Sequence, residues 1–285
     1  MKWTRGTQND DVIDARGSRV SGGVKIGAGG VVGVLVLAVL SQVLGVDLSG
    51  LLGGGGGGAG SATEHSTNPP RGPDPDAETV NFVKFVMKDI QDTFEGLYRA
   101  EGKPYRKAKL VLFTDAVDTA CGRSSSAIGP FYCPPDEKAY IDLSFCQMLK
   151  DRLGAPGDFA QAYVLAHEIG HHLQTLNGLE RTVRRLSTDK RSRNAASVKQ
   201  ELQADCFAGV WGHSAYARKL LEIGDLEEAV NAASQIGDDR LQKEAGREVN
   251  AETFTHGTSA QRMKWFRRGY DTGRFSSCDT FSEEP

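Results

Sequence analysis

Apolar and polar residues follow two different periods along this chain, and each period predicts one kind of element. Apolar residues at helical spacing predict helices over residues 76–100, 145–153, 158–177 and 197–213. Further helices are expected within 222–248 and after Thr258 or Ser259, either of which can cap the last one. Two shorter runs, 109–114 and 138–143, have the apolar character and spacing of strands. We expect these strands to form an antiparallel hairpin, which gives a mostly helical α+β domain with a small antiparallel sheet.

Two of the predicted helices have capping signals at their first residues. Asp76 is expected to cap the helix over 76–100. Asp158 is followed three residues later by Gln161, which is the spacing of a capping box, and Pro156 and Gly157 break the chain just before it. The helix that follows Asp158 is apolar nearly all round, which is typical of a buried helix.

A run of uncharged, mostly apolar residues precedes the predicted domain. Residues 26–46 carry no charge and would span about 31 Å as a helix, the thickness of a bilayer core. We expect a transmembrane helix here; a cleaved signal peptide and a buried helix are the alternatives. Basic residues in the polar segment 1–25 predict a cytoplasmic N-terminus, with everything after the span on the outer side. Residues 47–75, rich in Gly and Pro, are expected to be a flexible linker before a domain over 76–285.

Composition limits the classes of function that the chain can have. It has 285 residues, 25% of them charged, with a net charge of −3, and this balance does not favour a nucleic-acid partner. The part that follows the linker is long enough to bury a core of its own.

The chain has five cysteines, and all follow the apolar run. On the outer side of a membrane they can form disulfides. Cys121 and Cys133 flank a loop rich in Gly and Ser and make the most local pair, and Cys206 with Cys278 would tie the C-terminal tail to a central helix. Cys146 is then left over. The sequence alone leaves this connectivity open.

The strongest chemical signal is His-Glu-x-x-His at residues 167–171. On a helix, His167 and His171 lie one turn apart on one face and can bind one zinc ion. Glu168 between them can reach a water that the metal activates, as a general base. Burying these groups together with His172 would be costly without a partner, and a metal compensates for that cost. The alternative is a buried helix with incidentally spaced histidines.

A second predicted helix supplies the third ligand. Glu201 and Asp205 are four residues apart and share a face of the helix over 197–213. Glu201 would complete a site of two histidines and one glutamate, and Asp205 would accept a hydrogen bond from a ligand imidazole. The swapped assignment, with Asp205 as the ligand, remains open.

Downstream polar residues have two interpretations each. His256 can donate to a developing oxyanion or can stabilise a turn, and Arg262 can support His256 or form a buried ion pair. The basic run over 181–193 can bind acidic groups, but a solvated face is favoured.

Together, these motifs resemble the neutral zinc metallopeptidases, a family of bacterial membrane-anchored proteins, nearly from end to end. The resemblance implies a zincin-type fold with Glu201 as third ligand, in the bacterial cytoplasmic membrane. Its Glu-x-x-x-Asp and His…Arg segments also resemble those of membrane-linked zinc endopeptidases that act in protein quality control. The segments that carry the resemblance are 2–3, 12–17, 120–122, 129–133, 140–143, 167–172, 201–206 and 256–262.

The sequence therefore predicts a membrane-anchored peptidase with one zinc ion per chain, acting on peptides or proteins. Glu168 is the expected base, and the hairpin edge at 140–143 is a candidate docking strand for extended substrate. The alternative is a non-catalytic, membrane-tethered zinc-binding scaffold or interaction protein. A fourth protein ligand would favour that alternative, because structural zinc sites are closed. The candidates for a fourth ligand are Cys206, His172 and His256.

Overall fold

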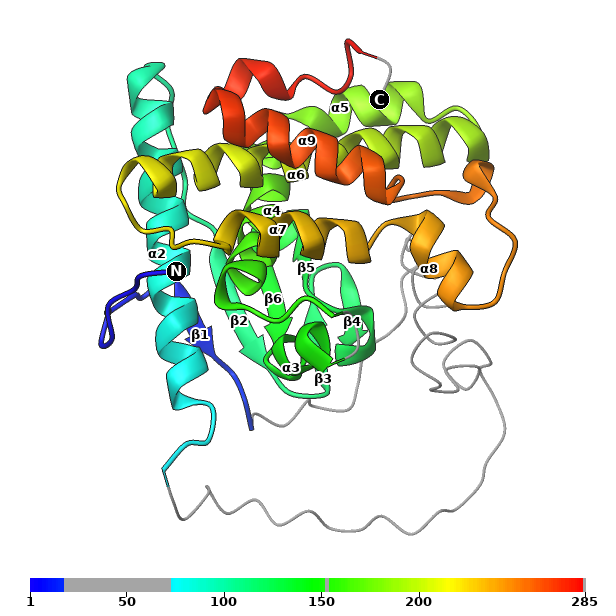
Figure 1. Ribbon diagram of the computed structural model, residues 1–285. Coiled ribbons are helices and arrows are strands. Elements are labelled where there is room, and N and C mark those ends of the chain that lie inside the picture. Colours follow the sequence, from blue (N-terminus) through cyan, green and yellow to red (C-terminus); the bar gives the residue numbers. More distant parts are fainter. Residues whose placement is uncertain (18–72, 152–153, 284–285) are drawn as a thin grey trace, which may run out of the picture.

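The computed structural model describes residues 1–17, 73–151 and 154–283 (Figure 1). These residues form a mostly helical α+β arrangement with small sheets. The helices are α2 (Ala77–Ala100), α3 (Ser144–Asp151), α4 (Asp158–Leu176), α5 (Leu179–Leu186), α6 (Lys190–Ala217), α7 (Asp225–Gln235), α8 (Asp238–Glu244) and α9 (Ser259–Thr272). The strands are β1 (Val12–Asp14), β2 (Lys109–Phe113), β3 (Ala116–Thr119), β4 (Gly122–Ser125), β5 (Phe131–Cys133) and β6 (Lys138–Asp142).

The main sheet has the order β1-β2-β6-β5, and its first three strands are parallel. The prediction of an antiparallel hairpin over 109–114 and 138–143 is therefore wrong. Residues 114–137 between the two strands are long enough for a crossover, which parallel strands need. Instead of a plain loop, they form the small β3–β4 sheet and the strand β5, which adds to β6 in the antiparallel direction.

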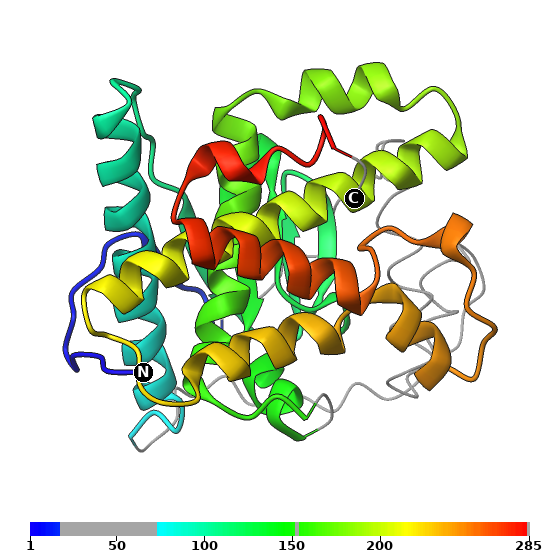
Figure 2. The same ribbon diagram turned by 45° about the horizontal axis from the view of Figure 1, so that its top comes forward.

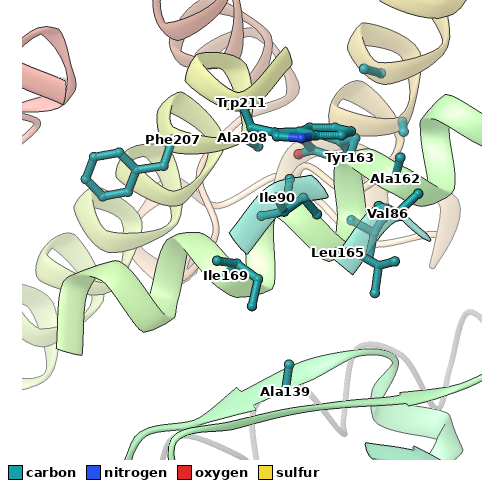
Figure 3. Packing of buried hydrophobic residues seen from close by; sticks show 14 of the residues in the cluster. Val86, Ile90, Ala139, Ala162, Tyr163, Leu165, Ile169, Phe207, Ala208 and Trp211 are labelled. Atoms are coloured by element: carbon teal, nitrogen blue, oxygen red, sulfur yellow. The ribbon is translucent and has the colours of Figure 1, made fainter. Parts of the chain in front are cut away.

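Helix α4 lies at the centre of the fold, in contact with α2, α6 and α7 and with the sheet. Its apolar side chains point in several directions, as the sequence predicted. Figure 3 shows Tyr163, Leu165 and Ile169 of this helix among side chains of other elements. Ile90 of α2 and Trp211 of α6 belong to the same buried cluster. The helix is buried because residues on nearly every side of it are apolar.

Glycines allow three helices to pack closely. An added Cβ at Gly170 of α4 would lie 2.9 Å from Cα of Ala204 on α6, so these helices touch through their backbones. Gly209 of α6 and Gly269 of α9 are more crowded still, because an added Cβ would lie 2.0 and 1.9 Å from a backbone oxygen of the facing helix. Figure 2 shows α6 and α9 running side by side. Helix α6 is also longer than the predicted 197–213.

The predicted caps are borne out at one helix and not at two others. Thr258 caps α9 in a capping box, as expected for that helix. Asp76 precedes α2, but its carboxylate pairs with Arg16 at 3.0 Å and makes no cap. Asp158 is the first residue of α4 and Gly157 is the N-cap, so the predicted capping box is absent there.

Residues 1–17 belong to the same fold as the rest of the described chain. β1 is an edge strand of the main sheet, next to β2. This differs from the expectation that residues 1–25 form a separate segment. The predicted span, 26–46, and most of the predicted linker, 47–75, lie outside the described residues. Among the described helices, none has both the length and the apolar character needed to cross a bilayer.

The domain contains one local and one long-range disulfide. They join Cys121 to Cys133 and Cys206 to Cys278, and Cys146 is a free thiol, as the sequence led us to expect. The first ties the β3–β4 turn to β5. The second ties the C-terminal tail to α6, the helix that carries Glu201.

Candidate metal centre

The three predicted ligands come together where α4 crosses α6. Nε2 of His167 lies 3.2 Å from Nε2 of His171 and 3.1 Å from Oε2 of Glu201. Nε2 of His171 lies 3.5 Å from Oε1 of Glu201. One ligand atom from each residue falls within 4.8 Å of the other two, which is the clustering that a single metal ion requires. The close approach of Gly170 to Ala204 brings the two helices near enough for this.

Asp205 lies on the other side of the His167 ring. Its Oδ1 is 2.8 Å from Nδ1 of His167, whereas Glu201 contacts Nε2. The two carboxylates, one helical turn apart, thus hold the two nitrogens of one imidazole. An Nδ1–H that donates to Asp205 leaves the Nε2 lone pair directed at the cluster. This geometry favours Glu201 as the ligand and Asp205 as the residue that orients His167.

Asp205 is itself held by two buried side chains. Arg262 of α9 donates from Nε to Oδ2 at 2.8 Å and from a terminal nitrogen to Oδ1 at 2.9 Å. The hydroxyl of Tyr163 donates to Oδ1 at 2.5 Å. Of the two roles considered for Arg262, the structure shows the buried ion pair. Tyr163 was missed because its spacing in α4 matches that of the core residues around it.

His171 is oriented by a neighbour that the sequence did not single out. Its Nδ1 lies 3.0 Å from Oε1 of Gln174, one turn further along α4. The amide nitrogen of Gln174 donates to the backbone oxygen of Gln200 on α6 at 2.7 Å. Gln174 therefore fixes the His171 ring and links the two helices next to Glu201. A glutamine within an apolar helix gives no sequence signal for this role.

Glu168 is buried beside the cluster, with 7% of its surface exposed. Burial raises the pKa of its carboxyl group, and the neighbouring histidines His167 and His171 oppose that rise. A carboxylate with a raised pKa is better matched to accepting a proton near neutral pH. The position and the burial of Glu168 both fit a general base.

The cluster has an excess of negative charge that suits a cation. Burial lowers the pKa of His167, but Asp205 and Glu201 outweigh burial and raise it to about 10. Burial raises the pKa of Glu201, but His171, His256 and His167 outweigh it, so this carboxyl stays ionised. The same negative charges also attract a divalent metal ion, which would bind Nε2 of His167 in place of a proton. Two imidazole nitrogens and one carboxylate are donors that zinc prefers, so the residues fit zinc.

His256 lies in the loop between α8 and α9. Its Nδ1 is 3.2 Å from Oδ1 of Asp238, and Oδ2 of the same carboxylate accepts from the backbone N–H groups of residues 255–257. Burial lowers the pKa of His256, but Glu201 and Asp238 outweigh burial and raise it. Asp238 thus holds the loop, and the negative charge of Glu201 stabilises the protonated form of His256.

Two of the candidates for a fourth protein ligand are engaged elsewhere. His172 contacts the hydroxyl of Tyr132 through Nδ1 at 2.9 Å and the backbone oxygen of Arg106 through Nε2 at 2.6 Å. Cys206 is bonded to Cys278 and offers no thiolate. Among the described residues, the group at this crossing whose ligand atoms lie close enough to share one ion has three members, His167, His171 and Glu201. Three protein donors are typical of catalytic zinc sites.

The comparisons with known proteins agree with these features. The profile of the family described as "Putative neutral zinc metallopeptidase" matches residues 1–281, and the chain belongs to that family. A protein of Escherichia coli strain K12, named uncharacterized protein YpfJ, is 44% identical over 99% of both chains. A protein of Mycobacterium tuberculosis strain H37Rv, named uncharacterized protein Rv2575, is 39% identical over 72% of this chain and 73% of its own. No solved structure matches the chain.

Proposed function

We propose that the protein is a zinc-dependent peptidase that hydrolyses peptide bonds in peptide or protein substrates. One observation carries this proposal. Two imidazoles and one carboxylate converge at the α4–α6 crossing, and the buried carboxylate of Glu168 lies beside them. Membership of the metallopeptidase family supports the same reaction class. We further propose that the fold is of the zincin type.

In this proposal, His167, His171 and Glu201 hold one zinc ion. The bound ion supplies Lewis acidity for the attacking water and for the scissile carbonyl. Glu168 accepts a proton from the attacking water and delivers it to the departing amine. Asp205 holds the His167 ring by its Nδ1 nitrogen throughout.

His256 is proposed to help the reaction by binding developing negative charge. Nδ1 of His256 faces Asp238, which leaves Nε2 as the nitrogen that can donate to an oxyanion. The raised pKa of His256 keeps that nitrogen protonated over a wider pH range. The same Asp238 contact fixes the loop, so the two roles considered for His256 are compatible.

The docking strand for an extended substrate needs revision. Residues 140–143 were the predicted edge, but β6 pairs with β2 on one side and β5 on the other. We propose β5 (Phe131–Cys133) as the docking strand, because it is the edge of the sheet that contacts α4. Tyr132 of β5 is fixed to α4 by its contact with His172. A polypeptide that adds to β5 would receive main-chain hydrogen bonds beside the metal centre.

We also propose that the domain works outside the cytoplasm, at the bacterial cytoplasmic membrane. Its two disulfides support an oxidising compartment. The uncharged run over 26–46 supports contact with a membrane.

The proposed activity is tested with the purified protein and an unstructured protein substrate. We expect the zinc-bound protein to cleave the substrate. Treatment with a chelator should abolish cleavage, and restoring zinc should recover it. Zinc analysis before and after treatment shows whether loss of activity follows loss of metal. Stoichiometric zinc without cleavage of unstructured proteins or peptides would instead favour a scaffold with a structural site.

A further inference from the structure

The N-terminal segment is bound into the domain by main-chain hydrogen bonds. β1 pairs with β2 in parallel, with Val12 opposite Leu110 and Asp14 opposite Leu112. The amide of Leu110 donates to the oxygen of Asp11 at 2.8 Å, and that of Ala15 donates to the oxygen of Leu112 at 2.9 Å. Lys109 adds an ion pair with Asp11 at 2.7 Å. Figure 1 shows β1 between α2 and the rest of the sheet.

Residues before β1 contact other elements of the domain. The ring of Trp3 packs edge-on against Phe82 of α2, with ring centroids 5.6 Å apart. The amide of Lys2 donates to the oxygen of Leu220, in the connection from α6 to α7, at 2.7 Å. The side chain of Asn9 donates to the oxygen of Lys84 at 3.0 Å. The segment 1–17 thus contacts α2 and the connection from α6 to α7 as well as β2.

Arg16 then joins the segment 1–17 to the residues just before α2. It lies one residue before Gly17, and its guanidinium contacts Asp74 at 2.7 Å and Asp76 at 3.0 Å. Asp76 is the residue immediately before α2, and Asp74 lies two residues earlier. The Arg16 side chain is 16% exposed, whereas Asp74 and Asp76 are 42% and 49% exposed, so this ion-pair cluster lies at the surface of the domain. Arg16 therefore fixes the end of segment 1–17 next to the start of α2.

We propose that residues 1–17 and the metal-binding domain lie on the same side of the membrane. A chain that crosses a bilayer once between Gly17 and Pro73 has its two flanks on opposite sides. Backbone hydrogen bonds between β1 and β2 cannot form across a bilayer core about 30 Å thick. The single crossing expected from the charge pattern is therefore incompatible with the pairing of β1 with β2.

If residues 1–17 lay on the other side of the membrane, the domain would also lose stabilising contacts. Without β1, the backbone groups along one edge of β2 would lose their partners, and an unpaired edge strand is prone to wrong pairing. Phe82 would lose its contact with Trp3. Asp74 and Asp76 would lose the Arg16 guanidinium that they share. The inference that residues 1–17 and the domain share one compartment thus rests on the pairing of β1 with β2 and not on a single surface contact.

The experiment uses the full chain in membranes, with Cys146→Ser removing the free thiol. Single cysteines are then introduced at exposed positions, Thr4 or Gln8 in the N-terminal segment and Glu248 or Arg267 in the domain. Spheroplasts are treated with a membrane-impermeant maleimide, before and after permeabilisation. Each variant's melting temperature is compared with that of the Cys146→Ser parent, so that labelling is scored only on folded protein.

We expect the N-terminal and domain positions to label under the same condition. Labelling of both from outside supports the inference and the proposed location together. Labelling of both only after permeabilisation supports the inference and contradicts the extracytoplasmic location. Labelling of Thr4→Cys and Gln8→Cys on the side opposite to Glu248→Cys and Arg267→Cys would overturn the inference. None of these outcomes bears on whether the metal centre is catalytic, so the peptidase proposal is tested separately.

Discussion

Asp205 and Glu201, one turn apart on α6, hold opposite nitrogens of the His167 ring, at 2.8 and 3.1 Å. This relationship assigns different tasks to two carboxylates that the sequence could not tell apart. Glu201 faces His171 and the site of the metal, and Asp205 faces Arg262. The predictions below separate the binding of metal, the chemistry and the packing that brings the helices together.

Substitution Asp205→Asn is expected to weaken zinc binding by about 10- to 100-fold, because it disturbs the group that orients His167. It also leaves the Arg262 charge buried without its counter-charge, which costs about 3–5 kcal/mol of stability. Competition with a chelating indicator measures the first effect and denaturant unfolding the second.

Tyr163→Phe is the matched control for that variant. It removes the hydrogen bond that Tyr163 donates to Asp205 and the longer one that it accepts from Arg262, and it keeps the ion pair, so the expected loss of stability is about 1–3 kcal/mol. Zinc affinity should change far less than in Asp205→Asn. Equal zinc affinity in Asp205→Asn and the wild type would refute the orienting role.

Glu168→Gln is expected to keep zinc and to lower the rate of peptide hydrolysis by at least about 100-fold, the usual contribution of a general base. The amide has nearly the same shape as the carboxylate but cannot accept the proton. Glu180→Gln, on the exposed helix α5, is the control and should retain full activity. The measurement is turnover of an unstructured substrate at equal zinc content, and unchanged turnover in Glu168→Gln would reject its role as base.

Gly170→Ala is expected to destabilise the domain by about 1–3 kcal/mol, as overpacking of a filled interface does. The new Cβ would lie 2.9 Å from Cα and O of Ala204, so the helices must separate. Zinc affinity should fall in parallel, because Glu201 moves with α6. Gly96→Ala in α2 meets no atom within 4 Å and should be neutral or stabilise by up to about 1 kcal/mol. A Gly170→Ala protein with native stability and zinc affinity would show that the contact is unimportant.

Cys278→Ser removes the disulfide to Cys206, which spans 72 residues. The chain-entropy model predicts a loss of about 4–5 kcal/mol for a loop of this length. Cys146→Ser removes a thiol that forms no disulfide and should change stability much less. Thermal unfolding under oxidising conditions compares the two variants. Equal melting temperatures for Cys278→Ser and the wild type would mean that this disulfide is not formed in the protein.

Local patterns were sufficient for most of the helices and for the three side chains that converge where α4 crosses α6. The apolar surroundings of residues 158–177 indicated a buried helix, and the spacing of His167 and His171 placed two imidazoles on one face of it. Glu201 followed from the same periodicity on a second buried helix. These features depend on neighbours within one turn, which sequence spacing encodes directly.

Contacts between distant segments were beyond such patterns. The parallel pairing of β2 with β6 depends on the path of residues 114–137, and nothing in the alternation of either strand specifies direction. The strand at Val12 is too short to stand out and becomes visible only through its partner β2. Helix crossings, and not local sequence, likewise determine the contacts of Tyr163 and Gln174. The same holds for the ion pair between Asp205 and Arg262.

X-ray absorption spectroscopy of the zinc-loaded protein tests the metal assignment most directly. The structure predicts nitrogen and oxygen donors only, with two imidazoles at about 2.0–2.1 Å and a carboxylate, and a remaining position filled by solvent. The His171→Ala variant should lose one imidazole contribution and bind zinc more weakly. A sulfur donor at a zinc–sulfur distance of about 2.3 Å, or a third imidazole from the protein, would contradict an open site of two histidines and Glu201.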